Sequence, residues 1–189
     1  MQAEGLLPCL DSGFGKFGCI YADPPWSYND KACDGGVGHE YSTMSVDDIC
    51  RLPVGKLALP DGAHLWMWTT WPMIREAAPH CVLDAWGFRW VGEIVWFKGE
   101  RLGIGRWLRP STEILILAEK GKKGLERYNQ RGHAFQWPRS KHSAKPVEFY
   151  DIIESLSSGP YIELFARNRP ADLISEGNRR NWTRWGNEA

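Results

Sequence analysis

The hydrophobic positions of this chain gather in short, nearly continuous runs that polar and glycine-containing stretches separate. Residues 17–22 form the first such run, and later ones cover 64–70, 88–97, 113–118 and 161–166. Short apolar runs bounded by turn residues, with many branched and aromatic side chains, indicate strands, and the continuous runs 17–22 and 113–118 indicate strands that are buried. We therefore predict a sheet built from these five segments.

Between the runs, apolar residues recur at helical spacing. Residues 73–86 and 145–157 each carry an apolar stripe of this kind, which predicts two amphipathic helices. Pro79 lies inside the first of them and predicts a kink or a break there. Ser45 has the character of an N-cap and acidic residues follow it, so a short helix is expected to run from it to Arg51.

Strands that alternate with helices predict an α/β fold of three layers, with helices on both faces of a mostly parallel central sheet. At 189 residues, the chain 1–189 is expected to form a single domain. Ligands of such sheets bind at the carboxyl ends of the strands. Asp23 and Arg167 each follow a predicted strand, so we expect them to share one crevice although they are far apart in sequence.

Composition narrows the class of protein. The chain is 43% hydrophobic with 11 Trp, as expected for a globular protein. Its five cysteines include no C-x-x-C pair and its five histidines are scattered, which favours reduced thiols and no metal site. No charged-then-apolar leader and no run of about 18 apolar residues is found. We therefore expect a cytoplasmic protein, without a membrane partner.

The formal net charge is zero, but the charge is unevenly distributed. Residues 98–145 hold 12 Lys and Arg against 4 Asp and Glu, a balance of +8 that leaves −8 for the remainder. Aromatic residues are interleaved with these cations. Cations that meet phosphates and rings that stack on bases are typical of a nucleic-acid surface, so this segment is expected to face a polyanion, with Lys122 and Lys123 among its contacts.

The first strand ends abruptly at Asp23-Pro24-Pro25-Trp26. Two prolines stop the ladder and fix a rigid bend, which presents a carboxylate, free carbonyls and an indole together. Asp23 and a proline carbonyl can each accept one N–H of an exocyclic amine while an aromatic ring stacks on the base. This is the chemistry of an amino-group methyltransferase. The plainer alternative is a strand-ending turn with a surface Asp and a core Trp.

Tyr28 lies two residues after Trp26 and is expected to contact the substrate. The polar, Gly-rich residues 27–41 that include it either close over a substrate or form a plain connection.

Several blocks in collinear order resemble the MT-A70 family of N6-adenine methyltransferases, from about residue 17 to 188 and most closely its short bacterial and phage members. These blocks are Tyr21–Trp26, Tyr41–Met44, Leu65–Pro72, Ala85–Phe88, Trp96–Lys98, His142–Pro146, Gly159–Arg167 and Trp185–Glu188. The resemblance implies a Rossmann-like class I methyltransferase fold that uses S-adenosylmethionine, with the amine-binding motif before the cofactor-binding segment. It needs no metal.

The resemblance also implies roles for individual residues. Asp23, Pro24, Pro25 and Trp26 match the catalytic motif that holds the target adenine. Positions that match the family's cofactor contacts are Lys145, whose charge suits the methionine carboxylate, and Phe165, Arg167, Asn187 and Glu188. Positions that match the surroundings of the target base are Tyr41, Trp107 and Glu113.

The expected activity is transfer of a methyl group to adenine N6 in DNA, from a target base that has to leave the duplex stack. RNA is the nearest alternative polymer, because the motifs contact only the base. A non-catalytic, nucleic-acid-binding subunit of a methyltransferase complex is the alternative of another class, although the intact motif argues against it. A homo-oligomer or a partner subunit is left open.

Overall fold

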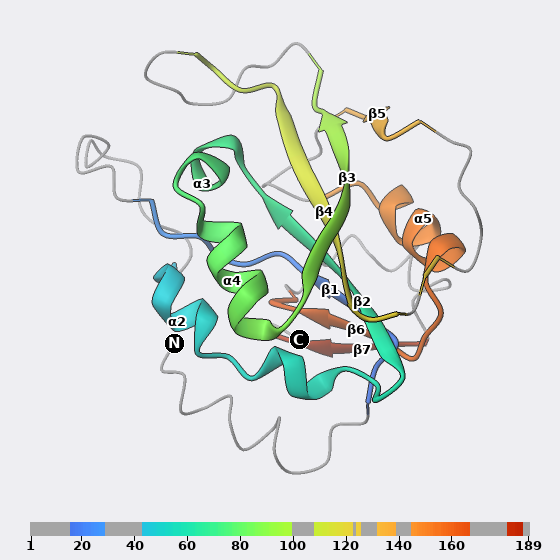
Figure 1. Cartoon of the computed structure of the whole chain (residues 1–189). Coiled ribbons are helices and arrows are strands. Elements are labelled where there is room, and N and C mark those ends of the chain that lie inside the picture. Colours follow the sequence, from blue (N-terminus) through green and yellow to red (C-terminus); the bar gives the residue numbers. More distant parts are fainter. Residues whose placement is uncertain are drawn as a thin grey trace.

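The computed structural model describes residues 16–28, 43–99, 108–122, 124–125, 132–138, 145–166 and 181–186. A seven-stranded sheet runs through these residues in the order β5-β3-β4-β2-β1-β6-β7 (Figure 1). Its strands are β1 (Cys19–Ala22), β2 (Gly62–Thr69), β3 (Arg89–Phe97), β4 (Thr112–Gly121), β5 (Ala134–Gln136), β6 (Tyr161–Leu164) and β7 (Trp182–Trp185).

The sheet is mostly parallel, as the sequence predicts. β1 pairs in parallel with β2 on one side and with β6 on the other, β7 continues in parallel beyond β6, and β3 pairs in parallel with β5. Only β4 is reversed, because it pairs antiparallel with both β2 and β3. Since the chain leaves β1 toward β2 and later returns to its other side at β6, the strand order reverses between β1 and β6. Ligands of open α/β sheets bind at such a switch point.

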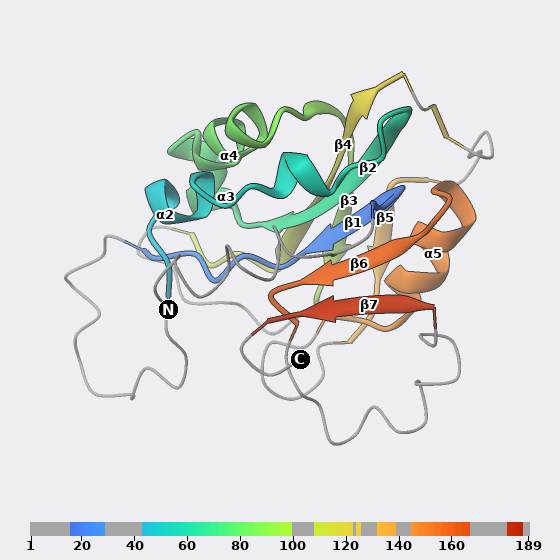
Figure 2. The same cartoon turned by 90° about the horizontal axis from the view of Figure 1, so that it is seen from below.

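Helices cover both faces of the sheet, so the expected three layers are present. The first layer holds α2 (Val46–Cys50), the 3₁₀ helix η3 (Val54–Leu57), α3 (Trp71–Arg75) and α4 (Ala78–Trp86), and the second holds α5 (Glu148–Leu156). Figure 2 shows α2, α3 and α4 together on one side of the sheet, with α5 apart from them.

Side chains that alternate along the strands divide the core into two halves. Ile20 and Ala22 of β1 join the cluster under the first helical layer, whereas Cys19 and Tyr21 join the cluster under α5. All four residues of β1 and all eight of β2 are buried. The continuous run 17–22 therefore lies where both faces of the strand are covered, as we expected, whereas β3, from the run 88–97, is partly exposed along its length.

The helix predicted for 73–86 is divided in two, as Pro79 indicates. α3 ends at Arg75, and Ala77 takes the left-handed conformation with φ 56° before α4 begins. Pro79 lies in the first turn of α4, where its missing N–H has no intrahelical partner to lose. Gly87, with φ 74°, ends α4. At the short helix, Ser45 caps α2 by accepting a hydrogen bond from the Asp48 amide at 3.1 Å.

Two strands were not predicted. β5 lies within the basic segment and β7 within the polar C-terminal tail, and neither has a continuous apolar run. Trp182 nevertheless anchors β7, because its buried indole donates to Glu154 at 2.6 Å and its ring stacks on Tyr161 at 4.8 Å. The strand conformation of β5 and β7 depends on pairing with a strand that is distant in sequence, and no local sequence pattern predicts such pairing.

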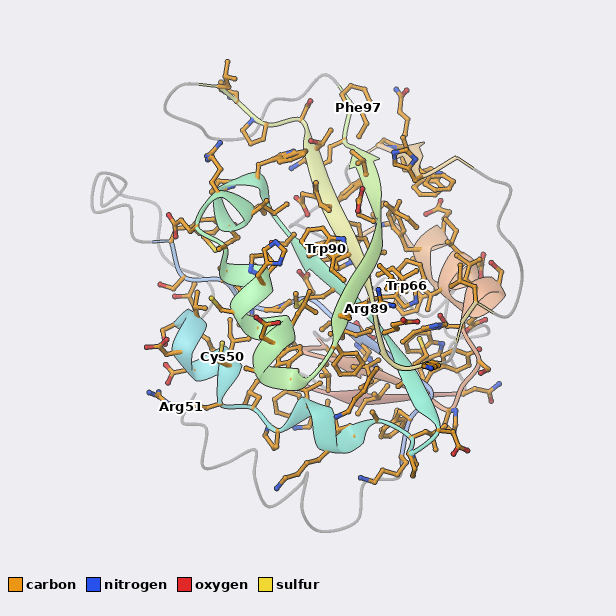
Figure 3. All side chains as sticks on the ribbon, viewed as in Figure 1. Cys50, Arg51, Trp66, Arg89, Trp90 and Phe97 are labelled. Carbon is orange, nitrogen blue, oxygen red and sulfur yellow. The ribbon has the colours of Figure 1, made fainter. Side chains whose placement is uncertain are left out.

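Because the parallel strands share a direction, their carboxyl ends lie along one side of the sheet and their amino ends along the opposite side. We call the edge beyond Ala22, Thr69 and Leu164 the carboxyl edge, and the opposite one the amino edge. Arg89 and Phe97 mark the amino and carboxyl ends of β3 in Figure 3. The reversed β4 begins at the carboxyl edge, where Thr112 pairs with Phe97, and ends at the amino edge.

Candidate active site

The bend after β1 is held by backbone hydrogen bonds. The Trp26 amide donates to the Pro24 carbonyl at 2.9 Å, and the Met44 amide donates to the Pro25 carbonyl at 2.8 Å. Ser27 returns a bond to Met44 O at 3.0 Å. Each proline carbonyl thus uses one of its two acceptor positions to fix the bend and keeps a second one.

Trp26 fastens this bend to the core. Its side chain is 6% exposed and packs in the cluster under the first helical layer, and its indole N–H donates to Trp68 O at 3.1 Å. The ring therefore has little surface open to a base, and what the structure shows of Trp26 is support for the bend. A direct contact with the target adenine stays a prediction.

Asp23, directly after β1, is bound to Lys145 from the segment that leads into α5. Lys145 Nζ lies 3.0 Å from each Asp23 carboxylate oxygen, and the two side chains are 11% and 23% exposed. The structure therefore joins a predicted catalytic residue and a predicted cofactor residue that are 122 positions apart in sequence.

Glu113 and Lys98 extend this pair into a chain of four charges. Lys145 Nζ lies 3.3 Å from Glu113 Oε2, and Lys98 Nζ donates to Glu113 Oε1 at 2.9 Å. The side chains of Lys98 and Glu113 are only 9% and 19% exposed. Two cations thus alternate with two carboxylates at the carboxyl edge.

The pKa shifts of this chain of charges have opposing causes. Burial lowers the pKa of the Lys145 ammonium, but the nearby Asp23 and Glu113 outweigh it and the pKa lies above its ordinary value. Burial raises the pKa of Glu113, but Lys145 and Lys98 outweigh it and that pKa lies below its ordinary value. At neutral pH Lys145 and Glu113 are therefore both charged.

Aromatic side chains form the floor beneath these charges. Lys145 Nζ lies 5.1 Å from the ring centroid of Trp68, close enough for a cation–π interaction. The Trp68 indole donates to Tyr21 Oη at 2.6 Å, so its ring is held in one orientation. The ammonium is therefore positioned by two carboxylates and by an indole face.

Tyr28 lies close to the same cluster. Its side chain is 49% exposed, its hydroxyl is 3.0 Å from Thr70 Oγ1, and the charges of Glu113, Lys145 and Asp23 all act on its phenol. Burial of the phenol is the main cause of a pKa above the ordinary value. An exposed aromatic ring beside Asp23 suits the predicted contact with substrate.

Phe165 lies beyond β6, beside Asp23, because Leu164 pairs with Ala22. It is 7% exposed and takes φ 61°, a conformation that residues other than glycine rarely adopt. The end of β7 presses against it: a Cβ on Gly186 would lie 2.2 Å from Ala166 O and 2.9 Å from the Phe165 carbonyl carbon. The carboxyl ends of β1, β6 and β7 therefore meet at the switch point.

Other predicted site residues lie elsewhere. Lys122 follows β4 at the amino edge, since Gly121 pairs with Gly62, so the structure does not bring it to Asp23. Tyr41, Trp107, Lys123, Arg167, Asn187 and Glu188 lie outside the described residues.

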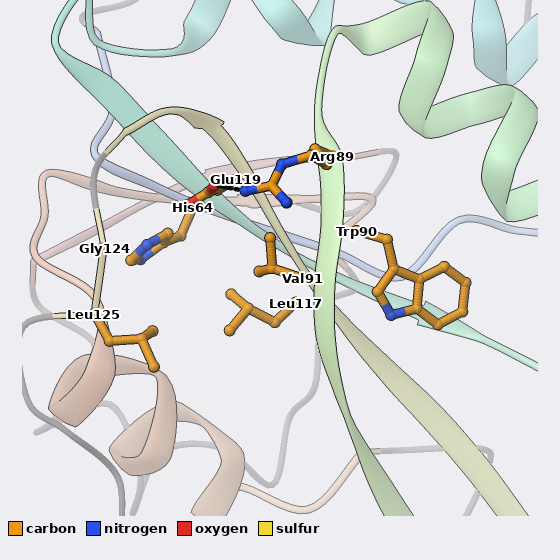
Figure 4. Close-up of a pocket in the computed structure, with 8 residues that line it drawn as sticks. All are labelled: His64, Arg89, Trp90, Val91, Leu117, Glu119, Gly124 and Leu125. Atoms are coloured by element: carbon orange, nitrogen blue, oxygen red, sulfur yellow. Dashed lines mark hydrogen bonds and ion pairs between the residues drawn. The ribbon is translucent and has the colours of Figure 1, made fainter.

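The amino edge also holds a shallow pocket of about 480 Å³, lined by His64, Arg89, Trp90, Glu119 and Leu125 among others (Figure 4). Arg89 pairs with Glu119 across it. The pocket is open and lies far from the four charges in the sheet, so we do not assign the chemistry to it.

In the described part of the chain, no three His, Cys, Asp or Glu residues are grouped closely enough to hold a metal ion, and no helix has the length and apolarity that crossing a membrane requires.

With the strand order and the bend at the switch point established, the sequence can be compared with known families. The sequence model of the MT-A70 family matches residues 17–188. The chain belongs to the MT-A70 family. MT-A70 proteins are S-adenosylmethionine-dependent methyltransferases, and the α/β sheet of seven strands is consistent with their Rossmann-like fold.

Individual MT-A70 relatives cover most of this chain. A putative N(6)-adenosine-methyltransferase of Medicago truncatula is 33% identical over 175 residues, which is 87% of this chain and 26% of the relative. The human N(6)-adenosine-methyltransferase catalytic subunit METTL3 is 32% identical over 199 residues, 94% of this chain and 32% of the relative. The type II methyltransferase M.MunI of a Mycoplasma species is 28% identical over 197 residues, 92% of this chain and 78% of the relative.

This MT-A70 chain thus spans about a quarter to a third of these two eukaryotic relatives. Within the part that matches, the sequence places Lys98 in a motif block and in the basic segment 98–145, and does not predict that it joins the site. A signal was available, because Lys98 directly follows an apolar strand, as Asp23 does. Thr70 and Trp68 gave no such signal, since nothing in their spacing reports which partner they meet.

Proposed function

We propose that this chain transfers a methyl group from S-adenosylmethionine to the N6 amine of adenine in DNA. The observation that carries the proposal is the Asp23 carboxylate, which stands beyond β1 at the switch point and is held 3.0 Å from Lys145 Nζ. A carboxylate there accepts one N–H of an exocyclic amine, and the second acceptor position of the Pro24 carbonyl is suited to the other.

The residues at the switch point fit the cofactor. Lys145 is a buried cation suited to the cofactor's methionine carboxylate, and Phe165 follows β6 beside Asp23. S-adenosylmethionine, when bound, supplies the methyl group on a sulfonium. Lys145 would hold that carboxylate and would then bind Asp23 less tightly, which would leave the Asp23 carboxylate open to the amine.

Asp23 would act most strongly as the methyl group arrives. N6 then becomes tetrahedral and positively charged, and a fixed carboxylate stabilises this charge more than it stabilises the neutral amine. The proton leaves afterwards to Asp23 or to water. Glu113, kept ionised by Lys98 and Lys145, would hold the Lys145 ammonium when it moves from Asp23.

Among the relatives named, the one matched over most of its length is a type II methyltransferase, and this supports DNA as the polymer. The names of the eukaryotic relatives specify adenosine and support RNA as the second candidate. The non-catalytic alternative is less well supported, because a binding subunit has no need of a carboxylate held in a buried chain of charges.

The test is transfer of a labelled methyl group to single- and double-stranded DNA and RNA, followed by digestion to nucleosides and mass detection. We expect N6-methyladenine from DNA, and about a 100- to 1,000-fold lower rate from Asp23→Asn, which keeps the shape and removes the charge. Asp84→Asn, an exposed site on α4, serves as the matched control. Product from RNA alone would overturn the choice of polymer.

Calorimetry with S-adenosylmethionine separates the remaining alternatives. We expect heat of binding from the wild type and from Asp23→Asn, and a weaker complex from Lys145→Gln. No product on any polymer together with no heat would favour the non-catalytic subunit.

A further inference from the structure

Trp71 differs from the other tryptophans of the described residues in its exposure. Its side chain is 41% exposed, whereas Trp66, Trp68, Trp86 and Trp96 are each 1% exposed. Its indole N–H donates to Thr112 Oγ1 at 2.8 Å, so the one polar atom of the ring is satisfied within the protein. What faces solvent is therefore an apolar ring surface held in a fixed orientation.

Two neighbours place this ring at the carboxyl edge, which also holds the candidate active site. Trp71 follows Thr70, whose hydroxyl holds Tyr28 Oη at 3.0 Å. Its acceptor, Thr112, precedes Glu113, whose carboxylate pairs with Lys145. Thr112 and Glu113 are consecutive in β4, so their side chains point to opposite faces of the sheet, but both lie at the carboxyl edge that holds the chain of charges.

A cation accompanies the ring. Arg75 lies four residues after Trp71 in α3, a spacing that places both on one side of the helix, and it is exposed. Exposed Arg109 lies shortly before β4 at the same carboxyl edge. An open aromatic face with cations around it is the arrangement by which proteins hold unpaired nucleotides, with rings on bases and cations on phosphates.

We propose that Trp71 and Arg75 form a subsite for the nucleotide next to the target adenine, with the indole stacked on its base and the guanidinium on its phosphate. This subsite rests on the proposed function and extends it to the form of the substrate. Because aromatic rings with nearby cations hold unpaired nucleotides in this way, the subsite fits a neighbour that is unpaired when it binds. The protein therefore prefers single-stranded or locally opened nucleic acid.

The test measures binding of fluorescently labelled single-stranded oligonucleotides with one adenine, with either a normal base or an abasic residue on each side of it. We expect the wild type to lose about 5- to 100-fold in affinity when the neighbouring base is removed. Trp71→Ala should lose as much on the normal strand and nothing further on the abasic strand, because both changes remove the same stacking contact.

Controls separate this contact from a general loss of structure. Trp71→Phe keeps a ring and should keep most of the discrimination, and Trp90→Ala removes a partly exposed tryptophan at the amino edge and should keep all of it. Arg75→Ala should lower the slope of log affinity against log salt by about 0.7, the value for one phosphate on a single strand, while Arg75→Lys restores it.

The outcomes distinguish the subsite from the proposed function. Trp71→Ala that binds as the wild type does, or that still senses the abasic residue, overturns the subsite even where methyl transfer is normal. Discrimination that depends on Trp71 without methyl transfer to any polymer would keep the subsite and overturn the proposed function.

Discussion

The buried ammonium of Lys98 is expected to contribute to the free energy of unfolding. Its ammonium meets Glu113 at 2.9 Å, and its side chain is 9% exposed. Lys98→Met would leave Glu113 to share Lys145 with Asp23, so the cluster would carry an excess negative charge. Removing one partner of a buried pair costs about 3 kcal/mol. We expect a loss of this size in urea unfolding at pH 7, with most of it restored in Lys98→Arg; an unchanged midpoint would contradict the assigned pairing.

The same cluster predicts how stability depends on pH. Because Lys145 and Lys98 hold the pKa of Glu113 below its value in the unfolded chain, about 4.3, the folded state gains stability above that pH and loses it as pH falls through the lower folded pKa. Glu113→Gln should therefore be less stable than the wild type at pH 7 and lose less on acidification. Urea unfolding of both proteins from pH 7 to pH 3 checks this; parallel curves would remove Glu113 from the acid response.

At the scale of the elements, the close approach of β6 and β7 predicts the effect of a substitution on stability and on cofactor binding. Gly186 lies where a Cβ would be 2.2 Å from Ala166 O, against backbone that cannot move aside without shifting a strand. Gly186→Ala should cost about 1–3 kcal/mol, as overpacking does, and weaken binding of S-adenosylmethionine beside Phe165. Gly92→Ala is the control, because a Cβ there has nothing within 4 Å. Equal effects of the two substitutions in unfolding and calorimetry would contradict the close approach.

The elements also show what sequence can predict. Strands such as β2 have a local cause, a buried apolar run, and the division of α3 from α4 has one in Pro79. β5 and β7 have none, because their pairing partners lie far away in the chain. The candidate site divides in the same way: Asp23 follows from its motif, but its link through Lys145 and Glu113 to Lys98 depends on how three strands and the segment before α5 converge.

For the whole molecule, the sheet shows that the basic segment is not a single surface. β4 runs from the carboxyl edge to the amino edge and carries its charges to both. Lys98 is engaged with Glu113, and Lys120 donates to Gly55 O at 2.9 Å and lies 5.9 Å from the Phe88 ring centroid. The charge of +8 counted along residues 98–145 therefore includes cations that stabilise the fold.

Lys122 tests this division directly. The sequence suggests a contact with the substrate, but its position at the amino edge does not support one with a nucleotide at Asp23. We expect Lys122→Ala to keep the affinity for a short single-stranded oligonucleotide and the salt slope, because a strand bound at the carboxyl edge does not reach it. Arg75→Ala, measured by the same salt titration, should lower the slope. If both variants lower it equally, the nucleic acid crosses the sheet from one edge to the other, and both edges belong to the binding surface.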